Sequence, residues 1–282
     1  MIKVTYLGTT TLLFDDGKDQ LLFDCHVTRP SVWTYLFGRL KTDCGVADRV
    51  IEQFKMDRLR AIFISHSHHD HVMDAPYFAN KCGCKIYGTE STLNVARGGK
   101  VPEERLVLFG EDQKLEVGNF RITVLKSLHS KPGFFNNDLG QTIDEPFAQP
   151  ARKRAYKEGG SYDFLLEYEN KKILIRPSYN FIEGQLDGIQ ADVLFLAVAG
   201  LSKDKPEHKE KFWKETIDKV SPSLVIPLHW DNFFTPLYGP ILGLPKMFEF
   251  TGKSMHELAK ACAMREIPCV VQMPLTSITL ED

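Results

Sequence analysis

Five potential metal ligands stand within six residues of one another, directly after a short apolar run. The run 61–64 has the pattern of a buried strand, and the sequence HSHHDH follows it at 66–71. Residues two apart in an extended segment face the same way, so His66 and His68 can meet one ion, while Asp70 and His71 can face a second position past the turn. Imidazole and carboxylate together suit Zn²⁺ and, less tightly, Mn²⁺ or Fe. The pattern therefore indicates a site for one or two metal ions at the end of this strand.

Two other interpretations of the cluster are weaker. In a solvated polar loop, neutral histidines at this density would each need a hydrogen-bond partner, and charged ones would repel one another. A structural zinc site is usually closed by cysteines, and none lies near 66–71. His69 points away from its neighbours by alternation, so we expect it at the surface or behind a ligand.

Short strand-like runs dominate the first half of the chain and mix with helical patterns in the second. Asp16-Gly17 and Gly118-Asn119 are typical of hairpin turns between strands. Apolar residues at helical spacing predict helices over 46–54, 208–220 and 254–263, the last capped by Ser254. The expected strands cover 3–6, 11–14, 20–24, 61–65, 85–87, 105–109, 114–117, 120–125, 164–168, 172–175, 193–197 and 224–227.

Two long stretches fit neither periodicity. Residues 130–161 are rich in Gly, Pro, Asn and charge, and residues 231–246 are rich in Phe, Pro and Gly. Loops longer than about 12–15 residues are usually functional or disordered. Because no internal repeat or linker-like tract divides the chain, we expect a single domain over 1–282 with loop insertions at these two places.

The charge balance limits the classes of partner. With 35 Lys and Arg against 37 Asp and Glu, the formal net charge is −2, which gives no electrostatic footprint for nucleic acid or a membrane surface. The chain has no run of 18 apolar residues, and its first residues lack the pattern of a secretory signal. We therefore expect six reduced cysteines, a cytoplasmic location and a small-molecule substrate, with neither nucleic acid nor a membrane as partner. A homo-oligomer is compatible with the sequence.

The segment 66–71 has the His-X-His-X-Asp-His pattern of the metallo-β-lactamase superfamily of metal-dependent hydrolases, and nearly the whole chain resembles this family. Matching landmarks are Leu128-His129-Ser130, Leu228-His229-Trp230 and Leu22-Phe23-Asp24. The resemblance implies an α/β fold, a four-layer αββα sandwich with the metals at one edge between two sheets. It further implies that His66, His68 and His129 hold one ion, that Asp70, His71 and His229 hold the other, and that Asp24 orients a ligand histidine.

The chain departs from the family pattern after the strand expected at 172–175. Most members carry a Gly-Asp pair there, and its carboxylate bridges the metals. Ser178 takes the Asp position in this chain, and its neutral hydroxyl is a poor bridging ligand. Six ligands remain for two ions, but we expect the second ion to bind more weakly. The departure also disfavours a redox role like that of the persulfide dioxygenases, because these relatives use this Asp as an iron ligand. The di-iron flavoproteins are disfavoured as well, since they carry Glu at the position of His68.

The resemblance implies hydrolysis as the reaction. Zn²⁺ lowers the pKa of bound water from near 16 to about 7, so a metal-bound hydroxide could attack an ester, lactone, amide or phosphoester. Asp70 is then a candidate catalytic residue, as a proton acceptor. Within the superfamily the chain looks most like the branch that includes the ascorbate-phosphate lactonase. The alternatives are a non-catalytic metal-binding protein, which Ser178 favours, and a phosphodiesterase or nuclease of the superfamily.

A few further residues are candidates for contact with the substrate. Phe134 follows His129 and Phe233 follows His229, where apolar pocket walls would fit a ligand site. Arg152 belongs to a basic cluster, 152–157, that either contacts an anionic group of the substrate or is simply solvated. His26 follows Asp24 closely enough that we expect it near the site.

Overall fold

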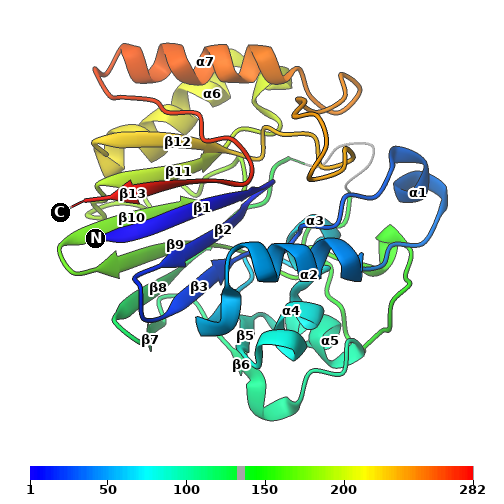
Figure 1. Ribbon diagram of the computed structural model, residues 1–282. Coiled ribbons are helices and arrows are strands. Elements are labelled where there is room, and N and C mark those ends of the chain that lie inside the picture. Colours follow the sequence, from blue (N-terminus) through cyan, green and yellow to red (C-terminus); the bar gives the residue numbers. More distant parts are fainter. Residues whose placement is uncertain (132–136, 282) are drawn as a thin grey trace.

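Two β-sheets packed face to face form the centre of the molecule (Figure 1). The computed structural model describes residues 1–131 and 137–281. The seven-stranded first sheet has the order β13 (Thr276–Leu280), β1 (Ile2–Gly8), β2 (Thr11–Asp15), β3 (Gln20–Phe23), β4 (Leu59–Phe63), β5 (Lys85–Gly88) and β6 (Leu106–Leu108). The six-stranded second sheet has the order β12 (Leu224–Leu228), β11 (Val193–Ala197), β10 (Lys171–Arg176), β9 (Ser161–Tyr168), β8 (Phe120–Ser127) and β7 (Lys114–Val117).

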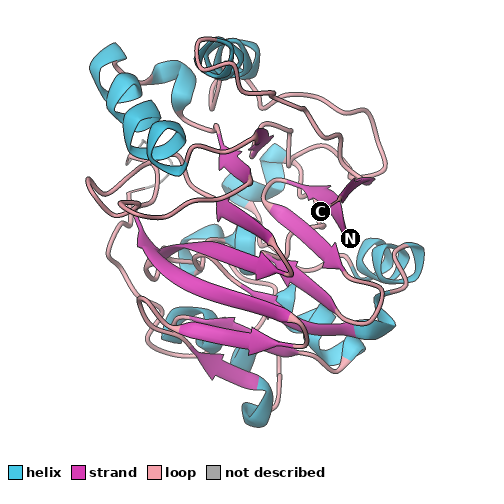
Figure 2. Cartoon of the chain, turned by 90° about the vertical axis from the view of Figure 1, so that its left-hand side faces the viewer, coloured by secondary structure: helices cyan, strands magenta, loops and turns pink. Residues whose placement is uncertain are grey.

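Helices cover the outer faces of both sheets, as two views at right angles show (Figures 1 and 2). Helices α2 (Cys44–Gln53), α4 (Ala75–Cys82) and α5 (Glu90–Gly98) pack on the first sheet, and α6 (Pro206–Trp213) and α7 (Thr251–Ala263) pack on the second. Two short helices, α1 (Val32–Phe37) and α3 (His69–Val72), follow β3 and β4 in the chain. The predicted four-layer αββα sandwich is confirmed.

Alternation along the strands of the first sheet divides their side chains between two cores. In β2, Leu12 and Phe14 belong to the core between the sheets, whereas Leu13 belongs to the core under the helices. This follows from the two-residue period of a strand. Between the sheets, the ring of Phe23 in β3 lies 5.3 Å from that of Phe164 in β9. Both faces of the first sheet are therefore buried, as its nearly continuous apolar runs require.

Most of the predicted elements are present, with some corrections. The hairpins at Asp16-Gly17 and Gly118-Asn119 join β2 to β3 and β7 to β8. The predicted cap at Ser254 is wrong, because α7 begins three residues earlier and the buried hydroxyl of Ser254 donates instead to the Glu249 carboxylate. The helix predicted over 208–220 begins at Pro206 and passes into a π-helical turn over Lys214–Asp218. Five elements were not predicted: α1, α3, α4, α5 and β13.

The two long irregular stretches flank one edge of the sandwich. Within the described residues of 130–160, the regular structure is one 3₁₀ turn, Lys153–Ala155. Residues 231–246 contain neither a helix nor a named strand. In the described part of the chain, no helix is long and apolar enough to cross a lipid bilayer.

A buried ion pair ties the second of these stretches to the loop after β3, and hydrogen bonds to the same carboxylate tie it to β1 and the turn that follows. Arg29 Nη1 lies 3.1 Å from Asp231 Oδ2, and both side chains are buried. Asp231 Oδ1 also accepts hydrogen bonds from the hydroxyl of Tyr6 (2.6 Å) and from the backbone N–H of Thr9 (2.8 Å). Gly8, with φ +95°, lies against this pair: a Cβ there would overlap the guanidinium of Arg29 and come within 2.7 Å of Asp231 Oδ2.

We predict that Gly8→Ala destabilises the fold by more than Gly17→Ala. Both glycines have a positive φ, +95° and +87°, so both substitutions cost roughly 1 kcal/mol of left-handed backbone strain. A Cβ at Gly17 meets nothing within 4 Å, whereas a Cβ at Gly8 must displace a buried ion pair, which costs about 3 kcal/mol more. Urea unfolding measures both free energies. Equal losses of unfolding free energy in the two variants would show that the close approach of Gly8 to the ion pair does not affect stability.

Candidate metal centre

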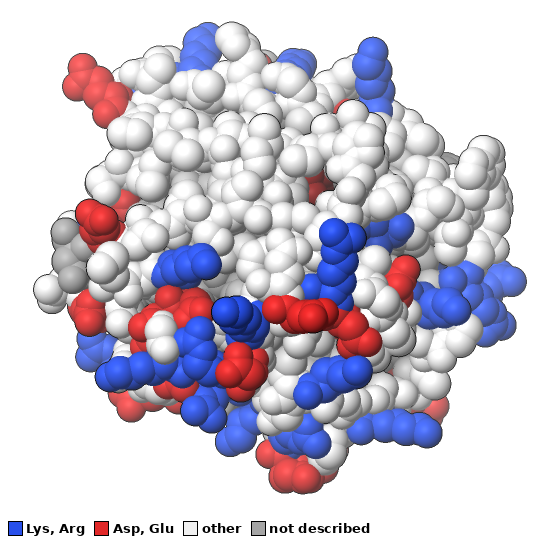
Figure 3. All heavy atoms as spheres, viewed as in Figure 1, with Lys and Arg blue, Asp and Glu red and all other residues white. Residues whose placement is uncertain are grey.

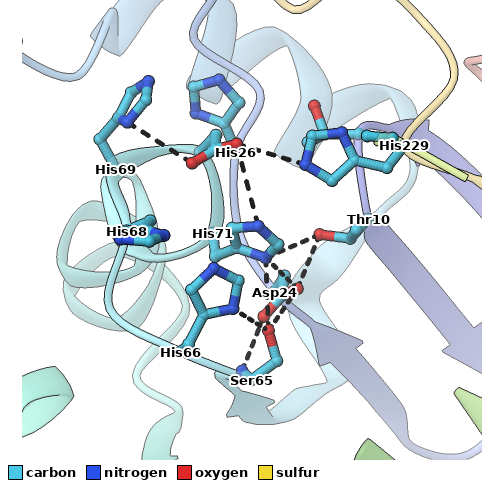
Figure 4. Close-up of polar contacts among 12 residues, drawn as sticks. Thr10, Asp24, His26, Ser65, His66, His68, His69, His71 and His229 are labelled. Carbon is cyan, nitrogen blue, oxygen red and sulfur yellow. Dashed lines mark hydrogen bonds and ion pairs between the residues drawn. The ribbon is translucent and has the colours of Figure 1, made fainter. Parts of the chain in front are cut away.

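The segment HSHHDH leaves the buried end of β4 and turns directly into helix α3. His66 and His68 lie in the extended part, and the helix that begins at His69 contains Asp70 and His71. His71 comes round beside His66 (Figure 4). The rings of His66 and His71 are 3.7 Å apart, centroid to centroid. All the side chains of 66–71 are buried. A short strand end followed at once by a helix therefore concentrates these groups in one place.

His129, which follows β8, completes a group of three histidines with His66 and His68. One nitrogen from each lies within 4.8 Å of the others, and His68 Nδ1 is 3.2 Å from His129 Nε2. The remaining nitrogens of these two rings face acceptors. His129 Nδ1 donates to the carbonyl of Ser130 (3.0 Å), and His68 Nε2 faces the Asp138 carboxylate (3.1 Å).

These partners fix which nitrogen of each ring carries the proton. A carbonyl or carboxylate oxygen only accepts, so His129 Nδ1 and His68 Nε2 are protonated and the two facing nitrogens present lone pairs. The buried Nε2 of His66 has no hydrogen-bond partner among the described residues. Lone pairs directed at one another need a positive charge between them. This donor set therefore fits a cation with imidazole ligands, such as Zn²⁺.

Asp70, His71 and His229 form the second group, again with one ligand atom each within 4.8 Å of the others. Asp70 Oδ2 lies 3.4 Å from His229 Nε2 and 3.9 Å from His71 Nε2. His229 follows β12 with φ +59°, and its backbone N–H donates to the carbonyl of Thr9 (2.5 Å). Left-handed backbone at a residue other than glycine is strained and persists only where the surroundings hold it, here through the hydrogen bond to Thr9.

Asp24 stands behind the second group and orients it. Its Oδ2 lies 2.7 Å from His71 Nδ1 and accepts from the hydroxyls of Thr10 (2.7 Å) and Ser65 (3.0 Å), while Oδ1 accepts from the Ser65 N–H (2.8 Å) (Figure 4). The proton of His71 therefore lies on Nδ1, and Nε2 is left to face Asp70. The family resemblance implies such a contact for Asp24, as the residue that orients a ligand histidine.

Burial and neighbouring charges keep the candidate ligands in the protonation states that metals require. Burial, together with repulsion from neighbouring histidines, lowers the pKa of His66 well below its usual value and that of His129 to about 3. Burial alone would raise the pKa of Asp70, but electrostatic interactions with the neighbouring His69 and His71 and the hydrogen bond with His229 hold it well below its usual range. Neutral imidazoles and an ionised carboxylate are thus available at neutral pH.

A comparison with protein families identifies the fold and the motif together. A model described as the Beta-lactamase superfamily domain matches residues 39–230, more than half of the chain, and this span contains all six candidate ligands. The chain belongs to the metallo-β-lactamase superfamily.

Two curated relatives within the superfamily match parts of the chain. It is 28% identical over 151 residues to the probable metallo-hydrolase YhfI of Bacillus subtilis strain 168, a match that covers 45% of this chain and 55% of YhfI. It is 25% identical over 165 residues to ribonuclease J2 of the same strain, covering 50% of this chain and 29% of that protein. The matches thus span about half, or less, of these relatives' own length.

Two solved structures extend the likeness to the whole fold. The crystal structure of YhfI superimposes with a TM-score of 0.61 at 16% identity, covering 99% of this chain and 100% of YhfI. CmlA, a diiron β-hydroxylase from Streptomyces venezuelae, has the same TM-score at 12% identity and covers 99% of this chain, which spans 54% of CmlA. At such identities the two likenesses concern the fold alone.

A cavity of about 710 Å³ opens onto both groups of candidate ligands. Phe233 and the buried Ser178 line it, as do Lys153, Arg154 and Lys157. Arg152 does not line it: this residue is exposed and only precedes the 3₁₀ turn that brings its three basic neighbours to the wall. Phe134 lies outside the described residues.

Two further histidines lie close behind the candidate ligands. His69 is buried and lines the cavity, contrary to a surface position, because helix α3 turns it under Tyr35; the two ring centroids are 5.1 Å apart. His69 Nδ1 is 3.5 Å from Asp70 Oδ1. His26 is completely buried 5.8 Å from the ring of His69 and 6.2 Å from that of Phe233. Neither ring nitrogen of His26 has a hydrogen-bond partner among the described residues.

Sequence reasoning missed three residues of this site. Asp138 binds His68 from the long loop 128–160, Tyr35 reaches the cavity wall from α1, and Asn180 contacts the backbone of His129. None of them stands in a motif or on a periodic face. Each acquires its position only when a loop folds over the end of a sheet, so no local pattern could have indicated it.

We predict that His26→Phe flattens the pH dependence of stability of the metal-free protein. Burial holds the pKa of His26 well below its usual value, so at mildly acid pH the unfolded chain binds one more proton than the folded chain. The free energy of unfolding therefore falls as the pH drops below about 6.5, by up to about 1.4 kcal/mol per pH unit for each such histidine. Chelator-treated protein unfolded in urea at several pH values measures this slope.

The matched control is His256→Phe, at an exposed histidine of α7. It should leave the slope as it is in the wild type. A His26→Phe slope equal to that of the wild type would contradict a neutral, buried His26 in the folded protein.

Proposed function

We propose that this chain is a metal-dependent hydrolase that cleaves an ester, lactone, amide or phosphoester bond of a small molecule. The observation that carries the proposal is the convergence of two three-residue ligand groups from three distant segments on one cavity. Membership of the superfamily supports it, as does the similarity to YhfI, which is named a probable metallo-hydrolase. A large cavity beside the candidate ligands also favours an enzyme. The alternative is a non-catalytic metal-binding protein, which Ser178 supports.

The residues of the site divide the work of such a reaction. A bound metal ion would lower the pKa of water to about 7 and polarise the substrate. Asp70 is held ionised between His229 and His69, so it is the proposed acceptor of the proton that the attacking water loses, and it would pass this proton to the leaving group. The rings of Tyr35 and Phe233 line the cavity, where they would exclude water and hold the apolar part of the substrate.

Zinc is the proposed metal, with one or two ions per chain. Imidazole-rich donor sets suit Zn²⁺, and Mn²⁺ or Fe would fit the carboxylate-containing group. Ser178 lines the cavity where most members of the superfamily have a bridging carboxylate, and its hydroxyl is neutral. We therefore propose that the group containing Asp70 binds its ion more weakly than the three histidines do. The diiron centre of CmlA does not bear on this choice, because the likeness concerns only the fold.

Small molecules remain the proposed substrates, although ribonuclease J2 is a relative. On the face seen in Figure 3, Lys and Arg are intermixed with Asp and Glu, and no continuous basic surface is present there. A nuclease typically needs such a surface to hold the phosphate backbone. We also keep the cytoplasm as the proposed location, since disulfides are rare there and the six cysteines are free. The proposed unit is the single domain 1–282.

We predict that replacing His66 and His68 together by Ala removes bound metal and hydrolysis at the same time. These residues supply two of the three donors of one group, so one histidine cannot retain the ion. Metal content is measured by elemental analysis, and turnover with a panel of p-nitrophenyl esters, lactones and bis(p-nitrophenyl) phosphate. His256→Ala, at an exposed histidine, is the control. Unchanged turnover in the double variant would refute the proposed function.

Basic residues of the segment 153–157 line the cavity together with acidic ones such as Asp138 and Glu249, and these basic residues predict a preference for anionic substrates. Arg154 lines the cavity and Arg152 does not, although both are exposed arginines of one short segment. We expect Arg154→Ala to raise KM for p-nitrophenyl hemisuccinate about 3- to 10-fold, with kcat little changed, because the lost contact involves a charged group. KM for uncharged p-nitrophenyl acetate should stay constant. If Arg152→Ala raises KM for the hemisuccinate as much as Arg154→Ala does, or if KM rises equally for both esters, the basic residues that line the cavity do not select for charge.

A further inference from the structure

His129 stands in irregular backbone beyond the end of β8, and its neighbour Leu128 is exposed. Its ring must nevertheless deliver Nε2 to a point 3.2 Å from His68 Nδ1. The contact of its Nδ1 with the Ser130 carbonyl sets the rotation of the ring but not the position of the backbone. A candidate ligand in a loop needs a second anchor if the donor atoms are to stay in place.

Asn180 provides an anchor from the loop that follows β10. Its Nδ2 donates to the backbone carbonyl of His129 at 2.7 Å. Its Oδ1 accepts from the N–H of Phe181 at 2.9 Å, which fixes the orientation of the amide with the NH₂ group towards His129. This is the same loop in which Ser178 stands in place of the bridging carboxylate.

Arg176 and Asp163 in turn hold Asn180 from inside the second sheet. Arg176 Nη2 donates to the backbone carbonyl of Asn180 at 2.9 Å, and Arg176 Nε lies 2.9 Å from Asp163 Oδ2. Neither charged side chain has any solvent exposure. A fully buried ion pair contributes little net stability, because removing two charges from water offsets their attraction. Its effect here is on position. Asp163 in β9 holds Arg176 in β10, Arg176 contacts Asn180, and Asn180 binds the carbonyl of His129.

We infer that Asn180, held in place by Arg176, is a positioning residue that sets His129 for metal binding. The inference rests on the metal-dependent function proposed above and adds a role for the loop after β10. This loop lacks a bridging carboxylate. It supports the three-histidine group instead, through the hydrogen bond from Asn180 to the backbone of His129. Such supporting contacts typically change metal affinity 10- to 100-fold when they are lost.

Asn180→Asp tests the inference, because the two side chains have nearly the same shape. One oxygen still accepts from the Phe181 N–H, but an acceptor replaces the donor that faces the His129 carbonyl. We expect the affinity of the full chain for Zn²⁺ at the three-histidine group to fall about 10- to 100-fold, measured by competition with a chromophoric chelator. The visible absorption bands of the Co²⁺-loaded protein, which report ligand geometry, should change as well. Zn²⁺ affinity and Co²⁺ bands like those of the wild type would overturn the inference.

Asn94→Asp is the matched control. The buried Asn94 also donates Nδ2 to a backbone carbonyl at 2.7 Å, that of Ile143, but it contacts none of the candidate ligands. It should lose thermal stability as Asn180→Asp does and keep its Zn²⁺ affinity and Co²⁺ spectrum. If Zn²⁺ affinity falls equally in both variants, the effect at Asn180 is one of general stability and the inference fails.

Two more variants separate the possible failures. If His129→Ala binds Zn²⁺ like the wild type, His129 is not a ligand and the proposed metal site fails together with the inference. If His129→Ala loses Zn²⁺ while Asn180→Asp retains it, only the inference fails. Arg176→Lys keeps a cation beside Asp163 but loses the second arm that reaches Asn180, so it should show an intermediate loss of affinity. Should Asn180→Asp fail to fold, Arg176→Lys decides the inference by the same measurement.

Discussion

Aromatic contacts between the two sheets determine where the two groups of candidate ligands meet. The ring of Phe14 meets that of Phe195 at 6.1 Å, and the ring of Phe23 meets that of Phe164 at 5.3 Å, each pair joining the first sheet to the second. Such rings bury a large apolar area and pack in few orientations, so the sheets have little freedom to slide. The segment HSHHDH follows a strand of the first sheet, whereas His129 and His229 follow strands of the second. The two groups of candidate ligands therefore form only while the sheets stay in this register.

Each sheet also supplies its own support for the ligands near its edge. On the first sheet, the carboxylate of Asp24 orients His71 and ties the backbone of Ser65. On the second, Asn180 holds the carbonyl of His129. The two arrangements differ in chemistry: one acts on an imidazole ring and the other on the backbone of a ligand. The contacts of Asp24 lie at fully buried positions, where no water competes for them, whereas the contact between Asn180 and His129 is only half-buried.

The parts of this structure that could be predicted from sequence are those with local signals. The strands of both sheets alternate or run apolar, the two hairpins carry turn residues, and HSHHDH has a spacing that few other structures explain. The sequence carried no comparable signal for β13, whose residues are mostly exposed, or for the start of α7 three residues before Ser254. Arg152 and Lys153 differ by one position in a basic run, and only the 3₁₀ turn decides which of them faces the cavity. Asp138 and Asn180 depend on contacts across 70 and 51 residues, which no short pattern encodes.

The cavity and the ligand groups are built from different kinds of segment. The candidate ligands stand directly at or just beyond the ends of strands, whereas much of the cavity wall comes from the irregular stretches 128–160 and 231–250. Loops of this kind accept insertions and exchanges far more readily than strands do. Descendants of such a protein could thus acquire new specificities by rewriting these loops while the reactive core was inherited unchanged. Because the strand ends and the loops can change separately, one fold can support many different reactions.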